Sequence, residues 1–263
     1  MPPDEQYSLR MESEIFMTEL TIIIPAFNES RKIAADILAA DKFLSSEGIS
    51  GEIIVVDDGS ADDTADIARK TGQSIQSDSI VEQLGRNLGK GRAVRCGILK
   101  SRGEFVVFVD SGCCIPYREI KRGVELIRSG QCQIAHGSRK MKNCHIIQPQ
   151  SPYRKICSQL FHWFLIRDIK KLSNLTDTQC GFKVYLGSVA RTLYAESQID
   201  GFMFDVEVIL LALSGGHTIC EFPVDWSWDP DSRLKPGHEA IRVLTDLIKL
   251  KRQFRSFLKK NDK

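Results

Sequence analysis

The chain has 263 residues, of which 42% are hydrophobic and 27% are charged. This length suits one large α/β domain with a C-terminal extension and excludes two full catalytic domains, while the composition excludes a largely disordered chain. The net charge of +2 gives no indication of nucleic-acid binding, and we expect no nucleic acid among the partners.

Two local features bear on location. Residues 238–263 contain eight lysines and arginines against three acidic residues, and we expect a basic helix there that meets an anionic partner such as a membrane; a solvated helix end fits equally well. The eight cysteines lack zinc-site spacing, and no secretory leader or bilayer-spanning run is evident. A reducing, cytoplasmic location is therefore expected.

The first half alternates short apolar runs with helical patterns. After a loose arm at 1–18, the run 20–24 predicts a buried strand that ends at Pro25. Ser30 can cap a helix that reaches about residue 47. A second strand is predicted at 53–56.

The next helix is predicted from Ser60 to about residue 71, with Asp63 as the acidic partner in a capping box. This β-α-β-α order predicts parallel strands with right-handed crossovers. Later in the chain, strands are expected at about 75–82, 105–109, 133–136, within 177–185 and at 218–224, and helices at about 91–100, 116–129 and 205–213, with a polar loop at 226–237.

Three of the predicted strands end in a loop that carries polar side chains. These loops are Pro25–Glu29, Asp57–Ser60 and Asp110–Gly112. Ligands of open parallel sheets bind beyond the carboxyl ends of the strands, where carboxylates can accept hydrogen bonds from a ribose or a base, or hold a metal. Three such loops in order are difficult to explain by turn chemistry alone.

These loops also carry a family resemblance. The runs IIIPAFNES, IIVVDDGSADDT, GRNLGKGRAVRCG and GEFVVFVDSG resemble the donor half of family-2 glycosyltransferases with the GT-A fold. The downstream runs DTQCGFK, FDVE and EFPVDW are similar more specifically to the dolichyl-phosphate glucosyl- and mannosyltransferase branch. The resemblance extends over about residues 20–250.

The resemblance implies a Rossmann-like α/β fold in which helices flank a mostly parallel central sheet. It places a single glycosyltransferase domain at 19–237, with a donor half at about 19–137 and an acceptor half at about 138–237. The basic helix at 238–263 follows this domain.

For the donor, the resemblance implies a nucleoside pocket lined by Pro25, Ala26, Glu29 and Asp58, with Asp57 in support. Uridine and guanosine remain open, so both UDP-glucose and GDP-mannose are candidates. Lys90, between two glycines, is expected to bring positive charge to the diphosphate.

Asp110 matches the first position of the family's DxD metal motif, whereas Gly112 occupies the third. Asp110 is therefore expected to hold Mg²⁺ or Mn²⁺ with help from the diphosphate, but with weakened affinity. A metal-independent enzyme or a non-catalytic member that binds nucleotide sugars remains an alternative. Cys113 and the adjacent Cys114 are expected to pack rather than bind a softer metal.

The implied reaction is inverting transfer of a hexose, with glucose preferred, to a polyprenyl phosphate. Asp177 is the expected active-site carboxylate, which either orients the acceptor or acts as a base. Gln179 and Lys183 are expected beside it, and Arg233, with Lys235 a weaker candidate, is expected near the leaving diphosphate.

Two acidic residues and one segment complete the acceptor half. Asp205 and Glu207 are two positions apart on a helix, so we expect only one of them to face the site. The aromatic and basic segment 152–172 is typical of an interfacial helix, although a core helix is the alternative. Together with 238–263 it implies peripheral contact with the cytoplasmic face of a membrane, while a soluble acceptor remains open.

Overall fold

The protein is described by a computed structural model that covers residues 18–148, 169, 172, 174–228, 236–255 and 257. Its centre is a seven-stranded sheet in the order β3-β2-β1-β4-β7-β5-β8. The strands of this sheet are β1 (Leu20–Ala26), β2 (Gly51–Asp57), β3 (Asp78–Gln83), β4 (Phe105–Val109), β5 (Ile134–Ser138), β7 (Phe182–Leu186) and β8 (Ile219–Pro223). A separate parallel pair is formed by β6 (Ile146–Gln148) and β9 (Trp226–Ser227).

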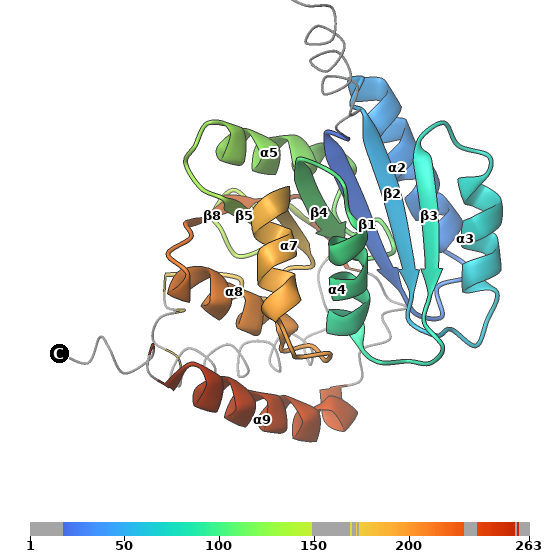
Figure 1. The fold of residues 1–263 in the computed structure, drawn as a ribbon. Coiled ribbons are helices and arrows are strands. Elements are labelled where there is room, and N and C mark those ends of the chain that lie inside the picture. Colours follow the sequence, from blue (N-terminus) through green and yellow to red (C-terminus); the bar gives the residue numbers. More distant parts are fainter. Residues whose placement is uncertain are drawn as a thin grey trace, which may run out of the picture.

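Helices cover both faces of the sheet (Figure 1). One face packs against α4 (Lys90–Lys100), α7 (Gly187–Glu196), α8 (Phe204–Ser214) and α9 (Pro236–Gln253). The other packs against α2 (Ile33–Glu47), α3 (Thr64–Gly72) and α5 (Ile120–Arg128), with a 3₁₀ turn at Tyr117–Glu119. The expected α/β architecture, a mostly parallel sheet between helical layers, is confirmed.

The central strands consist mainly of apolar residues, as is typical of strands with both faces buried. The polar residues among them, such as Thr21 and Glu52, are enclosed as well. Ile22, Ile23 and Ile24 of β1 are all fully enclosed, and successive residues enter opposite cores. The short runs of branched side chains were therefore correctly interpreted as buried strands.

Strand β7 is antiparallel to both of its neighbours, β4 and β5. Its first residue, Phe182, pairs with Val109, the last residue of β4. An antiparallel strand begins where its neighbours end, so the segment 176–181 lies at the same edge of the sheet as the loops after β4 and β5. This arrangement joins the two halves of the chain in one site.

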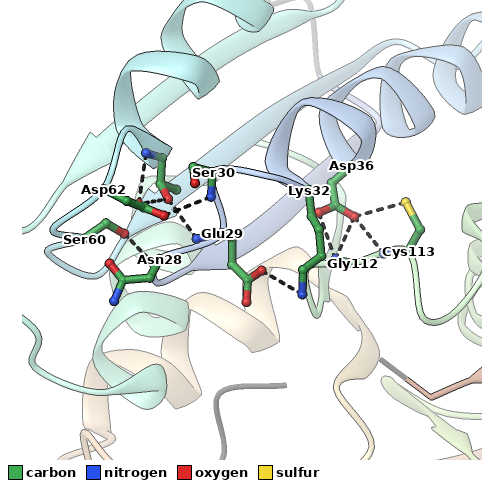
Figure 2. Close-up of polar contacts among 10 residues, drawn as sticks. Asn28, Glu29, Ser30, Lys32, Asp36, Ser60, Asp62, Gly112 and Cys113 are labelled. Atoms are coloured by element: carbon green, nitrogen blue, oxygen red, sulfur yellow. Dashed lines mark hydrogen bonds and ion pairs between the residues drawn. The ribbon is translucent and has the colours of Figure 1, made fainter. Parts of the chain in front are cut away.

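Both predicted serine caps are wrong. Lys32 occupies the cap position of α2 and Asp63 that of α3. The two serines instead tie neighbouring loops together: the Ser30 amide donates to Asp62 at 3.3 Å, and the Ser60 hydroxyl accepts from the Asn28 amide at 2.8 Å (Figure 2). Tertiary contacts between the loops after β1 and β2 have replaced the local ones.

Four other elements differ from expectation. Strand β3 begins at Asp78, not near residue 75, and β9 lies within the predicted loop 226–237. Strand β6, at Ile146–Gln148, was not predicted. Helix α7 was not predicted, because its ten residues begin with Gly187 and Ser188 and carry no clear start signal.

The C-terminal helix is confirmed, but it is more than a basic surface element. Helix α9 buries Leu247 and Leu250, followed by Phe254, in the cluster that also contains α7 and α8. Its opposite face exposes Ile248. Across the described part of the chain, no helix combines the length and apolar character needed to cross a bilayer.

The docking of α9 predicts a stability difference between neighbouring positions. Leu250→Ala should lower the free energy of unfolding by about 3 kcal/mol, because Leu250 is fully enclosed. Ile248→Ala, at a side chain that is 52% exposed, should change it by less than about 0.5 kcal/mol. Urea denaturation followed by circular dichroism measures both; equal losses would contradict the docking of α9.

Candidate active site

The loop after β2 holds the turn that leads into α4. Both oxygens of the Asp58 carboxylate accept backbone hydrogen bonds, from the Leu88 amide at 2.8 Å and the Gly89 amide at 2.9 Å. Asp58 therefore fixes the turn that precedes Lys90. A carboxylate has lone pairs for further acceptance, so its expected contact with the nucleoside base stays a prediction.

The loops after β1 and β2 are tied to each other. Ala26 pairs with Asp57 in the sheet, and the carboxylate of Asp57 accepts from the amide and hydroxyl of Ser60. Asp57 is fully buried, which agrees with its predicted supporting role. The Glu29 amide donates to Thr64 at 2.8 Å, so Pro25, Ala26 and Glu29 lie on an anchored loop.

The Glu29 carboxylate carries its own counter-ion. It lies 3.0 Å from the ammonium of Lys32, one turn along the chain (Figure 2). The charge of the Glu29 carboxylate is thus already balanced, and its contact with the nucleoside stays a prediction.

Lys90 and Asp110 form the central ion pair of the site. The Lys90 ammonium lies 2.6 Å from Oδ1 of Asp110. Burial lowers the pKa of Lys90, but the nearby carboxylates of Asp110 and Asp205 outweigh it and raise that pKa, so the lysine stays charged. Gly89, before Lys90, has φ +114°, and a Cβ there would collide with the Asp200 carbonyl. The glycine is therefore required at this turn.

Gly181 packs directly against the carboxylate of Asp110. A Cβ on Gly181 would overlap that carboxylate, and the Asp110 amide donates to the Gly181 carbonyl at 2.9 Å. The glycine of the DTQCGFK run thus gives Asp110 its place, which explains why this downstream run accompanies the aspartate at the end of β4.

Arg139, which the sequence analysis did not select, forms a two-pronged ion pair with Asp177. Its Nε and Nη2 lie 2.7 and 2.9 Å from the two carboxylate oxygens. Burial raises the pKa of Asp177, but Arg139 outweighs it and lowers that pKa to about 2. Asp177 is therefore ionised near neutral pH, and its contacts with Arg139 favour the orienting role over that of a base.

The signal for Arg139 was present in the sequence. It follows the strand at 134–138 and therefore lies at the same edge of the sheet as Asp110. Its guanidinium also lies over the Trp226 ring, 5.6 Å from the centroid. Applying the strand-end rule to this strand would have identified it.

Lys183 is not placed to contact a substrate, which corrects the prediction. Its ammonium donates to Asp205 at 2.6 Å and to the Cys180 carbonyl at 2.7 Å, and its side chain is 1% exposed. The cause is the strand position: Lys183 is the second residue of β7 and points into the core beside Phe108. Lys183 therefore supports the site from the core, by holding Asp205 and the Cys180 carbonyl.

The two acidic residues of α8 face different partners, as expected. Asp205 pairs with Lys183 at the site. The carboxylate of Glu207 instead accepts from the amides of Gln198 and Ile199, at 3.0 and 2.8 Å. Glu207 thus holds the loop before α8 and has no place in the reaction.

A divalent metal would find one accessible carboxylate here. The Asp110 side chain is 42% exposed, whereas Asp177 and Asp205 are 1% and 5% exposed and enclosed by cations. Among the residues that the structure describes, no three His, Cys, Asp or Glu side chains form a metal-binding group. Asp110 therefore fits a metal that takes its remaining ligands from a diphosphate and water.

Gly112, at the third position of the DxD motif, lies in a tight backbone turn. Gly112 has φ +97°, and its amide donates to the two oxygens of the buried Asp36 at 3.0 and 2.9 Å (Figure 2). The Cys113 amide donates to the same carboxylate at 2.8 Å. Partial burial and the charge of Asp36 raise the pKa of Cys113 to about 12, so its thiol stays protonated. Cys113 is nevertheless exposed, which does not match the expected packing role.

For the remaining predicted site residues, the structure gives fewer contacts or does not describe the residue. Gln179 lies in the segment that precedes β7 and is partly exposed. Arg233 and Lys235 lie outside the described residues. Of the segment 152–172, the structure describes Ile169 and Leu172, both of which are buried in the core beside α7 and α8.

Comparison with known proteins identifies relatives over most of the chain. The family described as Glycosyl transferase family 2 matches residues 21–193. A dolichyl-phosphate beta-glucosyltransferase of Dictyostelium discoideum is 31% identical over 242 residues, which cover 88% of this chain and 73% of that protein. The Homo sapiens protein of the same name is 30% identical over 88% of this chain and 74% of its own length.

Solved structures share the fold. A glucosyl-3-phosphoglycerate synthase of Mycobacterium tuberculosis superimposes with a TM-score of 0.66 at 17% identity, covering 95% of this chain and 85% of that one. A complex of that enzyme with Mn²⁺, UDP-glucose and phosphoglyceric acid gives a TM-score of 0.65 at 18% identity, covering 89% of this chain and 79% of that one.

The geometry at position 112 predicts that the motif cannot be restored by one substitution. Gly112→Asp should lower stability by about 1–3 kcal/mol, because a side chain is strained at φ +97°. It should not tighten Mn²⁺ binding. Thermal unfolding and Mn²⁺ titration with UDP present measure these effects.

Gly85→Asp is the matched control, since a Cβ at Gly85 meets open space. It should change stability by less than about 0.5 kcal/mol. Tighter Mn²⁺ binding by a stable Gly112→Asp variant would show that the turn is not constrained.

Proposed function

This chain belongs to glycosyltransferase family 2, and from that premise we propose that it transfers glucose from UDP-glucose to dolichyl phosphate with inversion at the anomeric carbon. The observation that carries the proposal is the presence of two anchored cations near Asp110: Lys90, which pairs with it, and Arg139, which is close enough to interact with its charge. Two anions, a diphosphate and a phosphate, must meet in such a reaction, and the site offers a fixed cation to each.

The donor end of the site is the edge formed by the loops after β1 and β2. Pro25, Ala26, Glu29 and Asp58 border the nucleoside, while Asp57 holds their loop in place. Lys90 then lies at the diphosphate, where its ammonium stabilises the charge that develops on the leaving group.

Three ion pairs balance charges at this edge of the sheet. They are Lys90 with Asp110, Arg139 with Asp177, and Lys183 with Asp205. A divalent cation and a diphosphate carry opposite charges, so each would offset the charge that the other brings to this site. We therefore expect Mg²⁺ or Mn²⁺ to bind with the nucleotide, with Asp110 as its protein ligand. The bound metal would neutralise the leaving diphosphate.

The acceptor needs orientation more than a base. A phosphate monoester is largely dianionic at neutral pH. Arg139 keeps N–H donors beyond the two that Asp177 takes, because a guanidinium carries five. One phosphate oxygen attacks the anomeric carbon, the bond from that carbon to the UDP oxygen breaks, and UDP leaves with the electron pair.

A polyprenyl acceptor requires contact with a lipid surface. The exposed lysines and arginines of α9, among them Lys249, Lys251 and Arg252, provide basic charge for anionic headgroups. The segment 152–172, aromatic and basic in sequence, adds a second candidate contact. We expect peripheral binding at the cytoplasmic face.

The direct test is transfer of labelled glucose from UDP-glucose to dolichyl phosphate in detergent micelles with Mn²⁺. Asp110→Asn should lower the rate by about 100-fold, because it removes the metal ligand and the partner of Lys90. Asp66→Asn makes the same change at a side chain that is 82% exposed and should leave the rate unchanged. Transfer from GDP-mannose alone, or only to a soluble hydroxyl acceptor, would contradict the proposal.

The pH profile separates the two roles considered for Asp177. With its pKa lowered to about 2, Asp177 is ionised throughout the range above about pH 4, so it contributes no step to the profile there. The kcat/KM for dolichyl phosphate should rise with pH through a midpoint at about 6, as the acceptor loses its second proton, and should level off above about pH 7.

Asp177→Asn should lower this rate at every pH, because it releases Arg139. It should not move the midpoint, because it removes no group that titrates between pH 5 and 8. A midpoint that shifts or disappears in Asp177→Asn would show that Asp177 acts as the base. Rates at pH 5–8 under saturating UDP-glucose provide the measurement.

A further inference from the structure

The EFPVDW run contains a carboxylate that the mechanism above does not use. Glu221 lies in β8, the edge strand, where it pairs with His136 of β5. Its Oε2 accepts from the Thr176 amide at 2.7 Å, and its Oε1 accepts from the Asp177 amide at 2.9 Å. One side chain thus holds two successive backbone N–H groups at the start of the acceptor segment.

These contacts continue to the guanidinium of Arg139. The hydroxyl of Thr176 lies 2.7 Å from that of Ser138, the last residue of β5. The carboxylate of Asp177 holds both the amide and the side chain of Arg139. Glu221 is therefore connected through the backbone of 176–177 to the cation that we assign to the acceptor.

The contact depends on a carboxylate. Each oxygen of Glu221 accepts one N–H bond, and such bonds to a charged acceptor are stronger than neutral ones. A glutamine of the same size offers one oxygen, and its NH₂ group would face the other backbone N–H. The backbone at 176–177 would then have to move, and Asp177 would carry Arg139 with it.

We propose that Glu221 is a positioning residue for the acceptor, which sets the place of Arg139 through the backbone of Thr176 and Asp177 without touching a substrate. The inference rests on the proposed function, since it assigns Arg139 to the acceptor phosphate. Donor binding depends on Asp58 and Lys90, which lie on other segments. The effect of Glu221 is therefore selective for the acceptor.

The first measurement compares the wild type with Glu221→Gln. The KM for dolichyl phosphate should rise about ten-fold, the effect of losing one charge-assisted hydrogen bond. The Kd for UDP-glucose with Mn²⁺, measured by calorimetry, should stay within about two-fold. An unchanged KM, or an equal loss in donor binding, would overturn the proposal.

Glu207→Gln is the control for a merely structural effect. Glu207 also caps two successive amides, those of Gln198 and Ile199, but on a loop that is not connected to Arg139. Its substitution should lower the unfolding temperature and leave the KM for dolichyl phosphate unchanged. If that KM rose as much as in Glu221→Gln, the loss of any carboxylate that holds two backbone amides would have the same effect, and the proposal would fail.

A double-mutant cycle tests the route through Arg139. Arg139→Lys removes the planar fork that Asp177 orients and should itself raise the acceptor KM. If Glu221 acts through Arg139, adding Glu221→Gln to this variant should raise the KM by less than about two-fold. A further ten-fold rise would mean that the two residues act independently, and the proposal would fail.

Two outcomes keep this inference distinct from the proposed function. A wild type that does not use dolichyl phosphate overturns both, whereas a wild type that does, with an unaffected Glu221→Gln, overturns this inference alone. If Glu221→Gln does not fold, Glu221→Asp is measured instead. The aspartate keeps the charge, but its side chain is one methylene shorter, so both oxygens move away from the two amides. The same acceptor-selective loss is expected, and its absence would count against the proposal.

Discussion

The contact of Gly181 with Asp110 is the constraint on which the site depends. It exists because β7 runs against the direction of β4 and β5, so that the segment before β7 lies where those strands end. The edge of the sheet therefore holds groups from both halves of the chain. Asp110 comes from the first half, and Asp177, which orients Arg139, comes from the second.

The parts of the fold that the sequence predicted are those set by short-range patterns. Fully apolar runs such as 105–109 identify buried strands. The polar loops that follow predicted strands led to Asp58 and Asp110 as candidate site residues. The serine caps failed because the hydroxyl of Ser60 serves a loop 32 residues away, a contact that no local pattern reveals. The start of α7 carried too weak a signal to be found.

Predicting the roles of charged residues was harder, because a role depends on which face of an element a side chain occupies. Lys183 and Arg139 both lie near the same edge of the sheet, yet the first is enclosed and the second is partly exposed. Their positions decide between them: Lys183 lies within β7 with its side chain in the core, whereas Arg139 follows the end of β5. A sequence does not state which face of a strand will be covered when the strand returns from far along the chain. The pairing of Asp177 with Arg139 likewise could not be predicted, because the two residues are far apart in the sequence.

The turn at Gly112 has a consequence for the evolution of this chain. Asp36 is fully buried, and the amides of Gly112 and Cys113, together with the Cys113 thiol and the charge of Lys32, offset the cost of enclosing its carboxylate. Position 112 can regain a side chain only if the turn changes, and the carboxylate at 36 would then lose its donors. The two positions are thus epistatic: lineages that carry an acidic residue at 112 should carry a different residue at 36, and substitutions at the two sites should occur together.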